Sequence, residues 1–482
     1  MKVDDTTRPE PPPVNAPASG SQAAPRLGLR EGLRALKAFA ADPLAALTTL
    51  AQRGESLQRL RGIDLSLLIL HDPELIGDAL MSKGDAFIKD RFTHDLDILL
   101  GQGLLTSEGD LWKRQRRMIA PSLSPKHIAG YADCMARRTA DFARELPERG
   151  TSDVHEALMQ LTLDIVVETL FGAEIDERDG QVGGLLEHLM EDYVLLVRTW
   201  RRLLPRWFPQ PVRRRIQKVS AAIDAIIERV VREKQAGALD GDDLLTRLLI
   251  AQKESEAAGD GADANARKTA DARQMRDELV TLFTAGHETT ALTMAYTLHL
   301  IAGRPEVQDR LHAEIEAAAP GRALNSSDAM GRLPFCTAVI RESMRLYPPA
   351  WIIGREAVRD CSVGPYAVKR GEQLLIAPYT THRNPKYFPE PDRFLPERWE
   401  GSDADSAGLY ESLPRYVYLP FGGGPRICVG NHFAMMEAVL ILGTLVRSKR
   451  FARTAEDPPL KFFPAVTLRP AGEILLEVSS RA

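Results

Sequence analysis

Apolar residues recur every three or four positions along most of the chain after Leu29. This spacing places them on one face of an α-helix, so the pattern predicts a body made mainly of helices. Two short apolar runs, "LSLLIL" at 65–70 and "GEILLEV" at 472–478, are typical of strands. No internal repeat is evident. We therefore expect a mainly α protein with small β-sheets (α+β), folded as a single large helix-rich domain over residues 28–482.

Two segments depart from this pattern. Residues 1–27 are rich in proline, alanine and serine and lack the apolar stretch of a signal peptide, so they predict a disordered tail. Residues 253–272, "KESEAAGDGADANARKTADA", have the composition of a surface loop that connects two helices.

A long helix is predicted over 273–303, where apolar residues follow the helical period. Its middle is unusual: Gly286 weakens a helix by about 1 kcal/mol relative to alanine, and Glu288 and Thr289 place polar groups where burial is expected. A zinc-protease motif is excluded, since HExxH needs a second histidine at the position of Ala291. The threonine could simply bond back to a carbonyl one turn earlier. Glycine, acid and threonine together favour a functional distortion, in which acid and hydroxyl relay protons.

A further helix begins near Phe335 and is stopped by two consecutive prolines at 348–349. Glu342 and Arg345 lie three residues apart and share one of its faces. Such a pair is usually solvated and weak, but a buried arginine would need an anion such as Glu342. The segment 381–400 adds arginines among prolines and aromatic residues, and we expect it to be irregular but packed.

Composition mainly excludes function classes. Hydrophobic residues make up 44% and charged residues 27% of the 482 positions, as in an ordinary globular protein, and a net charge of -4 predicts no nucleic-acid partner. The four cysteines are too scattered for a CxxC metal site or a secreted disulfide framework, so we expect reduced thiols and a cytoplasmic location. No apolar run of about 18 residues occurs, which argues against a transmembrane helix.

The segment "FGGGPRICVG" at 421–430 has two interpretations, a phosphate cradle or a cysteine ligand. The phosphate interpretation fails because neither GxxxxGK[ST] nor GxGxxG is present. Cys428 follows three glycines, which would let backbone approach a bulky planar group, and precedes an apolar helix whose N-terminal dipole favours a thiolate. With one cysteine nearby, zinc or an iron–sulfur cluster is disfavoured, whereas a single axial thiolate on haem iron needs no more.

Five motifs resemble those of the haem-thiolate monooxygenases, the cytochrome P-450 superfamily. The signature F-x-x-G-x-R-x-C-x-G is matched completely, by Phe421, Gly424, Arg426, Cys428 and Gly430. The others are similar to the family's W-x-x-x-R, oxygen-binding, E-x-x-R and P-E-R-F motifs: Trp112 to Arg116, Ala285 to Thr290, Glu342 to Arg345, and Pro396 to Trp399, where tryptophan replaces phenylalanine. They occur in the family's order, and the chain resembles soluble bacterial-type members.

The resemblance implies haem b as cofactor and O2 as co-substrate. Cys428 would be the iron ligand. Glu288 and Thr289 would deliver protons for oxygen activation, while Ala285 and Gly286 would leave room for oxygen beside the helix.

The resemblance also implies which residues hold the haem. Its contacts would be Phe421, Gly430 and, at the two propionates, Trp112, Arg116, Arg355 and Arg426. A buried charge network supporting the site would be formed by Glu342, Arg345 and Arg398.

An apolar pocket above the haem is implied for a lipophilic small molecule, which would gain one oxygen atom by hydroxylation or epoxidation. Besides the loop 87–105, the residues expected to line it are Phe283, Ala350, Trp351, Ile352 and Val466. The segment 197–215, with many arginines, is expected to form a lid. It could be a solvated basic surface, a site for a substrate carboxylate or a membrane contact. A fatty acid, a terpenoid or a polyketide-like compound would fit the pocket.

Electrons would come from a separate ferredoxin- or flavodoxin-type protein with its reductase, because no redox domain follows the last apolar run. The docking surface would be cationic, and its candidates are Lys113, Arg117, Arg447 and Lys449. The alternatives to an oxygen-dependent monooxygenase are a peroxide-driven or isomerase-type relative and a haem protein without catalysis. The adjacent Glu288 and Thr289 disfavour both.

Overall fold

The computed structural model describes residues 28–62, 66–172, 211–236, 243–257, 264–401, 409–456 and 458–481. The predicted tail at 1–27 and most of the predicted lid at 197–215 lie outside this part of the chain.

Helices dominate the described residues, as predicted. They are α1 (Leu29–Ala41), α2 (Pro43–Ala51), α3 (Pro73–Gly77), α4 (Arg91–His94), α5 (Asp97–Leu100), α6 (Gly109–Ile119), α7 (Pro125–Ile128), α8 (Ala132–Glu145), α9 (Val154–Phe171), α11 (Pro211–Ala236), α12 (Leu244–Ala257), α13 (Ala264–Ala302), α14 (Pro305–Ala318), α15 (Pro334–Leu346), α16 (Pro378–Thr381), α17 (Leu409–Ser412) and α18 (Asn431–Ser448).

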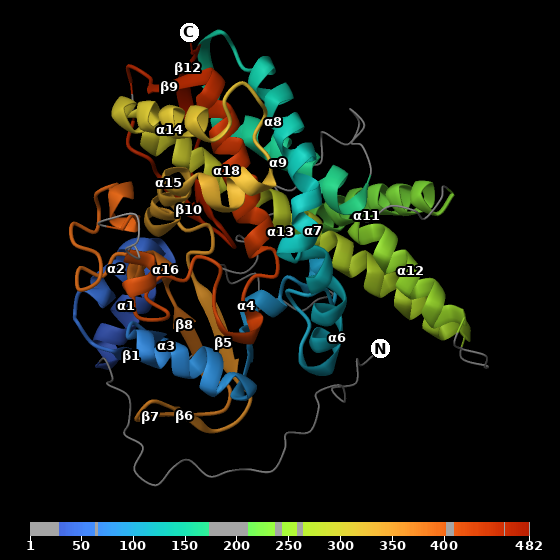
Figure 1. Cartoon of the computed structure of the whole chain (residues 1–482). Helices are drawn as coiled ribbons and strands as arrows, with labels where there is room; N and C mark the ends of the chain where they lie inside the picture. Colours follow the sequence, from blue (N-terminus) through green and yellow to red (C-terminus); the bar gives the residue numbers. More distant parts are fainter. Residues whose placement is uncertain are drawn as a thin grey trace.

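The strands are short. They are β1 (Leu57–Arg61), β2 (Ser66–Leu70), β3 (Phe87–Lys89), β4 (Arg149–Asp153), β5 (Ile353–Ala357), β6 (Cys361–Val363), β7 (Tyr366–Val368), β8 (Gln373–Ile376), β9 (Lys449–Arg453), β10 (Phe462–Pro464), β11 (Leu468–Pro470) and β12 (Leu475–Ser480). Figure 1 shows β1, β5 and β8 beside the N-terminal helices, below a helical part built around α8, α9, α13 and α18.

The larger sheet has the strand order β1-β2-β8-β5-β3, in which β2 and β8 are parallel and the other neighbours antiparallel. The apolar run predicted as a strand at 65–70 is β2. Because side chains alternate along a strand, Leu68 and Leu70 enter one hydrophobic cluster while Leu67 and Ile69 enter another. Both faces of the sheet are therefore covered, which explains why the run is apolar throughout.

Three smaller sheets complete the described β-structure: β4-β12-β9, β10-β11 and β6-β7. The strand predicted at 472–478 is β12, which begins at Leu475. The mainly α architecture with small sheets is confirmed.

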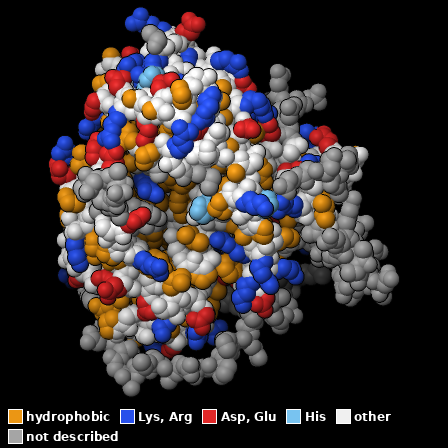
Figure 2. All heavy atoms as spheres, viewed as in Figure 1, with side chains coloured by type: hydrophobic (Ala, Val, Ile, Leu, Met, Phe, Trp, Pro, Cys, Tyr) orange, Lys and Arg blue, Asp and Glu red, His pale blue; other side chains and the backbone are white. Residues whose placement is uncertain are grey.

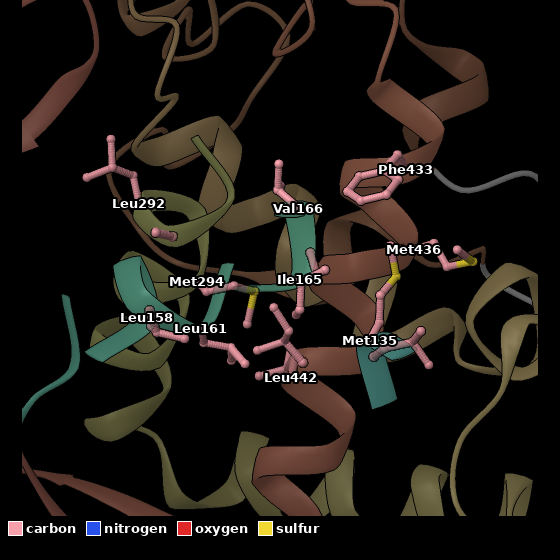
Figure 3. Packing of buried hydrophobic residues seen from close by; sticks show 14 of the residues in the cluster. Met135, Leu158, Leu161, Ile165, Val166, Leu292, Met294, Phe433, Met436 and Leu442 are labelled. Carbon is pink, nitrogen blue, oxygen red and sulfur yellow. The ribbon is translucent and has the colours of Figure 1, made fainter. Parts of the chain in front are cut away.

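The main hydrophobic core lies where four helices meet. α13 packs along α9, and α18 packs along α8. Figure 3 shows side chains from all four in contact, with Ile165 of α9 and Leu442 of α18 near its centre. This core holds rigid the two helices that carry the candidate chemistry, α13 and α18.

The helix predictions succeed where the apolar period is strong. α15 ends at Leu346 before the proline pair, and α18 begins directly after the cysteine loop. The loop predicted at 253–272 is wrong at both ends, since α12 extends to Ala257 and α13 begins at Ala264. Alanine, glutamate, lysine and arginine are good helix formers, so a polar stretch of this composition can extend helices. No helix among the described residues is long and apolar enough to cross a membrane.

Candidate functional site

The loop 421–430 folds back on itself and delivers its cysteine to the start of α18. The amide of Cys428 donates a 2.9 Å hydrogen bond to the carbonyl of Phe421. Gly422 and Gly424 have φ values of 74° and 71°, which favour glycine. The turn therefore places Cys428 three residues before the first residue of α18, Asn431.

At two positions the glycines of this loop make room for neighbouring protein, and their expected role as clearance for a planar group stays a prediction. A Cβ on Gly423 would lie 2.7 Å from the Tyr416 ring. A Cβ on Gly424 would overlap the carbonyl oxygen of Leu80. Because they lack side chains, these two glycines let the loop pack against the Leu80 backbone and the Tyr416 ring.

The Cys428 thiol faces an enclosed space. Its side chain is exposed, yet burial raises the pKa of the thiol, opposed by a hydrogen bond from the Gly430 amide and by the charges of Arg116 and Lys89. The side chain is therefore accessible to solvent although many protein atoms surround it. In the chain by itself, the desolvation of Cys428 therefore outweighs these opposing interactions, and thiolate ligation stays a prediction.

The otherwise buried middle of α13 has one accessible face among the described residues. Ala285 is exposed and Gly286 and Thr289 are half-buried, while Phe283 and Glu288 are buried. Positions 285, 286 and 289 share one helix face. The predicted oxygen-side residues thus lie together on the face that is not filled by side chains.

Gly286 packs against α9, and Thr289 forms a hydrogen bond within α13. A Cβ on Gly286 would lie 3.0 Å from a methyl group of Val166, so the glycine permits close contact between α13 and α9. Room for oxygen is not needed to explain it. Thr289 Oγ1 donates to the carbonyl of Ala285 at 2.9 Å, the back-bonding that its helical position allows.

Glu288 lies on a different side of α13 from Thr289. Its Oε1 accepts hydrogen bonds from Thr467 Oγ1 at 2.5 Å and from Arg469 Nε at 2.7 Å. Burial would raise the pKa of Glu288, but the Arg469 charge and the two hydrogen bonds hold it below its usual value. The acid and the hydroxyl predicted to act together therefore have separate partners, and sequence reasoning missed Thr467 and Arg469 as partners of the acid.

Three of the four predicted propionate residues surround the cysteine loop. Arg426 lies over the Trp112 ring, 4.2 Å from its centroid, and donates to the Ser107 carbonyl at 2.8 Å. Arg116 donates to the carbonyl of Ile427 at 2.6 Å. α6 presents Trp112 and Arg116 together because they are four residues apart on one face.

The fourth, Arg355, reaches the site from β5. Its guanidinium is buried and donates to its neighbour's carbonyl, Gly354 O, at 2.7 Å. Burial and the charge of Arg426 lower the pKa of Arg355 to about 10. Arg355 thus lies near enough to Arg426 to be affected by its charge, and its role at a propionate stays a prediction.

Two charged residues at this place were missed by sequence reasoning. Lys89 of β3 pairs in register with Arg355. Glu108, just before α6, accepts from the Lys89 amide at 2.7 Å, from His94 at 3.3 Å and from Arg426. No local motif marks Lys89, because its place depends on a strand pairing far along the chain.

The predicted network around Glu342 is buried and dense. Arg345 donates to both carboxylate oxygens, at 2.8 and 2.9 Å, and Arg398 donates at 3.1 Å. Trp399 Nε1 donates at 2.8 Å and the amide of Leu395 at 2.9 Å. The solvated alternative therefore does not apply, and the tryptophan that departs from P-E-R-F supplies a hydrogen bond that phenylalanine could not.

Two of the residues predicted to line a substrate pocket lie elsewhere. Trp351 is 1% exposed in the cluster beside α2, and its indole N–H donates to the Ala465 carbonyl at 3.0 Å. Phe283 is buried against His287, with ring centroids 5.6 Å apart. The prediction for Trp351 is wrong because its side chain is packed inside this cluster. Ala350, Ile352 and Val466 are half-buried and stay candidates for the pocket.

The residues considered for a cationic docking surface fall into two groups, those exposed on α6 and those engaged by other parts of the chain. Lys113, Arg114 and Arg117 are exposed on the outer face of α6, and Figure 2 shows Lys and Arg side chains gathered over that part of the molecule. Lys449 is buried and donates to the carbonyls of Leu146 and Pro147 at 3.0 and 3.1 Å, so it cannot meet a partner.

Arg447 is half-buried, and its guanidinium is engaged by neighbouring groups of the chain. It pairs with Glu316 at 2.8 Å and donates to the Ala319 carbonyl at 2.6 Å. The predicted docking surface is thereby reduced to the outer face of α6.

The residues present fit a haem. A single sulfur faces an enclosed space, and the groups next to it are cationic and aromatic, as the carboxylates and flat ring of haem b require. α18, which follows the sulfur, packs on α13 near its open face.

The chain is similar to several known proteins over most of its length. "Cyclooctat-9-en-7-ol 5-monooxygenase" of Streptomyces melanosporofaciens is 32% identical over 409 residues, which are 84% of this chain and 84% of that protein. "Putative cytochrome P450 132" of Mycobacterium tuberculosis is 29% identical over 443 residues, 87% of this chain and 89% of that protein. "Protein LUTEIN DEFICIENT 5, chloroplastic" of Arabidopsis thaliana is 28% identical over 439 residues, 86% of this chain and 70% of that protein.

The family model described as "Cytochrome P450" matches residues 34–478, from the first helix to the last strand. Since it spans the cysteine loop, the open face of α13 and the buried network alike, this chain belongs to the cytochrome P450 family.

Proposed function

We propose that this P450 monooxygenase inserts one oxygen atom from O2 into a lipophilic small molecule, by hydroxylation or epoxidation, and that Cys428 is its iron ligand. The exposed but enclosed thiol supports this most directly. Haem b ligated by a thiolate is the family's cofactor, and it supplies the chemistry of oxygen activation when bound. The parts that follow are what this chain's own residues do.

Four side chains would hold the haem carboxylates. They are Trp112, Arg116, Arg355 and Arg426, with Phe421 and Gly430 lining the loop. Arg426 is stacked on Trp112, and a guanidinium restrained by its neighbours loses less entropy when it binds a carboxylate.

Protons would pass through Thr289 and Glu288. Thr289 Oγ1 lies on the open face of α13, where it would hold a proton at the reaction site. Glu288 would replenish it after leaving Arg469, since a carboxylate can turn about its own side-chain bonds while the helix stays fixed. Ala285 and Gly286 would flank the same opening.

The substrate would be apolar over most of its surface. Ala350, Ile352 and Val466 are half-buried apolar residues that would line its pocket. The Streptomyces relative is named for a monooxygenase reaction on cyclooctat-9-en-7-ol, which favours a terpenoid-like compound over a fatty acid or polyketide.

P450 family members need a redox partner. We propose an acidic ferredoxin or flavodoxin that docks on Lys113, Arg114 and Arg117, because α6 carries these three outside and Trp112 and Arg116 inside. A cytoplasmic location stays a prediction from the cysteine pattern.

The test of ligation is the carbon monoxide difference spectrum of the reduced protein. Cys428→Ser should abolish the band that marks thiolate ligation, whereas Cys361→Ser, on β6, should leave it unchanged. Persistence of the band in Cys428→Ser would overturn the proposal. Product formation that depends on O2 and an electron donor, and is not replaced by peroxide alone, separates the monooxygenase from its peroxide-driven and non-catalytic alternatives.

A further inference from the structure

His382 lies between the buried Glu342 network and the segment that leads into the cysteine loop. It directly follows α16, and its side chain is fully buried. The amide of Leu419, two residues before the loop, donates a 2.9 Å hydrogen bond to His382 Nε2. A buried side chain therefore holds the backbone of a segment 37 residues further along the chain, at the point where that segment enters the loop.

The backbone of the same histidine is bound to the ion network. The His382 carbonyl accepts a 3.1 Å hydrogen bond from Arg345 Nη1, while the other nitrogens of that guanidinium hold the Glu342 carboxylate. Among the hydrogen bonds of the described residues, none joins Glu342, Arg345 or Arg398 directly to residues 419–430. The network therefore needs a connecting residue to act on the loop, and His382 has bonds to both.

Stacked aromatic rings support this connection. The His382 ring lies against the Tyr418 ring with centroids 5.0 Å apart, and Tyr418 lies against Trp399 at 4.6 Å. The Tyr418 hydroxyl donates to the carbonyl of Arg341 at 2.9 Å. Because Tyr418 directly precedes Leu419, the ring contact and the amide hydrogen bond restrain consecutive residues of one segment.

The hydrogen bond from Leu419 requires a neutral imidazole. A nitrogen that accepts from an amide carries no proton, so the ring proton lies on Nδ1. Burial and then the charges of Arg345 and Arg383 lower the pKa of His382 to about 3, and the nearby backbone of Met344 and Arg345 opposes this shift only in part. His382 is therefore an acceptor throughout the neutral range of pH.

The restraint reaches the cysteine through a short backbone path. The carbonyl of Leu419 accepts a 3.0 Å hydrogen bond from the Gly422 amide, which closes the first turn of the loop. The carbonyl of Phe421, inside that turn, accepts from the Cys428 amide at 2.9 Å. A shift of Leu419 away from His382 would therefore displace the turn that carries Cys428.

We propose that His382 is a positioning residue for the iron ligand: its Nε2 fixes the Leu419 backbone and thereby the turn that presents the Cys428 sulfur. This inference rests on the haem ligation proposed above and deepens it. It assigns a function in retaining the thiolate ligand to a residue outside the five motifs.

Two substitutions separate the hydrogen bond from the packing. His382→Gln carries its oxygen at the ε position, as Nε2 does, and can still accept from the Leu419 amide, whereas His382→Asn carries its oxygen one bond nearer the backbone. Both variants are uncharged amides. Tyr418→Phe removes the hydrogen bond to the Arg341 carbonyl and leaves the His382–Leu419 bond, so it is the control for a general loosening of this segment.

The measurement is the rate at which the reduced carbon monoxide complex changes from its thiolate-ligated to its thiol-ligated absorption band in mild urea. His382→Asn should convert up to about tenfold faster than the parent, the effect of one lost hydrogen bond. His382→Gln and Tyr418→Phe should stay close to the parent. Equal rates for His382→Asn and His382→Gln, or the same acceleration in Tyr418→Phe, would overturn the proposal.

Amide hydrogen exchange of the holoprotein tests the restraint without relying on the absorption bands. Peptides that cover residues 419–428 should exchange faster in His382→Asn than in His382→Gln, while peptides of α13 should exchange alike in both. Faster exchange spread evenly over the chain would contradict the positioning role. A parent that lacks the thiolate band would instead contradict ligation by Cys428, and the exchange comparison would still decide whether His382 holds the loop.

Discussion

The carboxylate of Glu288 and the guanidinium of Arg469 form a 2.7 Å ion pair in which each side chain is 6% exposed. Glu288 is adjacent in sequence to Thr289, but successive residues of a helix point about 100° apart. The acid therefore meets β11 while the hydroxyl meets the open face of α13. The relay proposed for these two residues has a resting state in which the acid is held by the strand.

Replacing Arg469 with methionine should reverse the effect of pH on stability that Glu288 produces. In the parent, the pKa of Glu288 is lowered, so its stabilisation is present above pH 4.5 and lost as pH falls through the folded pKa. Without Arg469 the buried carboxylate is unpaired, its pKa rises, and stability is lost as pH rises. Breaking the pair should cost about 3–5 kcal/mol at neutral pH. Urea unfolding at several pH values measures this.

The matched control for that variant is Glu288→Gln combined with Arg469→Met. Because the double variant has no carboxylate to titrate here, its stability should no longer follow this pH dependence. Parallel pH profiles for the parent and Arg469→Met would contradict the electrostatic role of Arg469.

Two substitutions in the Glu342 network should lower the free energy of unfolding by very different amounts. Trp399→Phe removes one hydrogen bond and leaves Arg345 paired, which should cost about 1–2 kcal/mol. Glu342→Gln leaves Arg345 and Arg398 without an anion in a buried site and should cost about 3–5 kcal/mol. Denaturant midpoints of the two variants give the comparison. A larger loss for Trp399→Phe would show that the indole, rather than the charge, holds the network.

Glu437 of α18 predicts the opposite pH dependence from Glu288. Burial raises its pKa from 4.5 to about 8, and the nearby Thr290 hydroxyl opposes this rise only in part. A raised acid pKa means that stability is fully present below pH 4.5 and is lost as pH rises toward 8. Glu437→Gln should be more stable than the parent at alkaline pH, by on the order of 3 kcal/mol. Melting temperatures that differ equally at acidic and alkaline pH would rule this out.

Alanine should be tolerated at position 286 only when a smaller residue on α9 makes room for its Cβ. The added Cβ would lie 3.0 Å from a Val166 methyl group, and overpacking of this kind costs about 1–3 kcal/mol. Gly286→Ala combined with Val166→Ala should recover part of that loss, because the smaller residue on α9 makes room. Thermal unfolding of the two single variants and the double variant measures the coupling. Simple additivity would mean that the two positions do not touch.

Charge reversal on the outer face of α6 should slow electron delivery. Lys113→Glu combined with Arg117→Glu should reduce the rate of reduction by an acidic ferredoxin several-fold at low salt, with a smaller difference at high salt. Stopped-flow reduction under carbon monoxide gives the rate, and Lys37→Glu on α1 is the control. Rates that do not change with salt or with charge reversal would place the docking surface elsewhere.

Much of the fold could be predicted because its signals are local. α13, α15, α18 and β2 follow from apolar spacing and proline stops, and the cysteine loop and the Glu342–Arg345 pair follow from short motifs. The prediction of a polar loop at 253–272 is wrong at both ends because helix-forming residues that lack an apolar face have the same composition as a loop. The pocket prediction for Trp351 is wrong because the elements packed on an extended segment decide which of its side chains are buried.

By itself the sequence determined the thiolate ligand candidate, the acid and hydroxyl on the long helix and the arginines of the buried network, because each lies within a few residues of its motif partners. Tertiary structure alone decided that Glu288 pairs with Arg469, that Lys89 stands opposite Arg355 and that Lys449 is buried. These contacts join segments far apart in the chain. Their pairing is set by how strands register and how the core closes, and neither leaves a local pattern for a sequence to show.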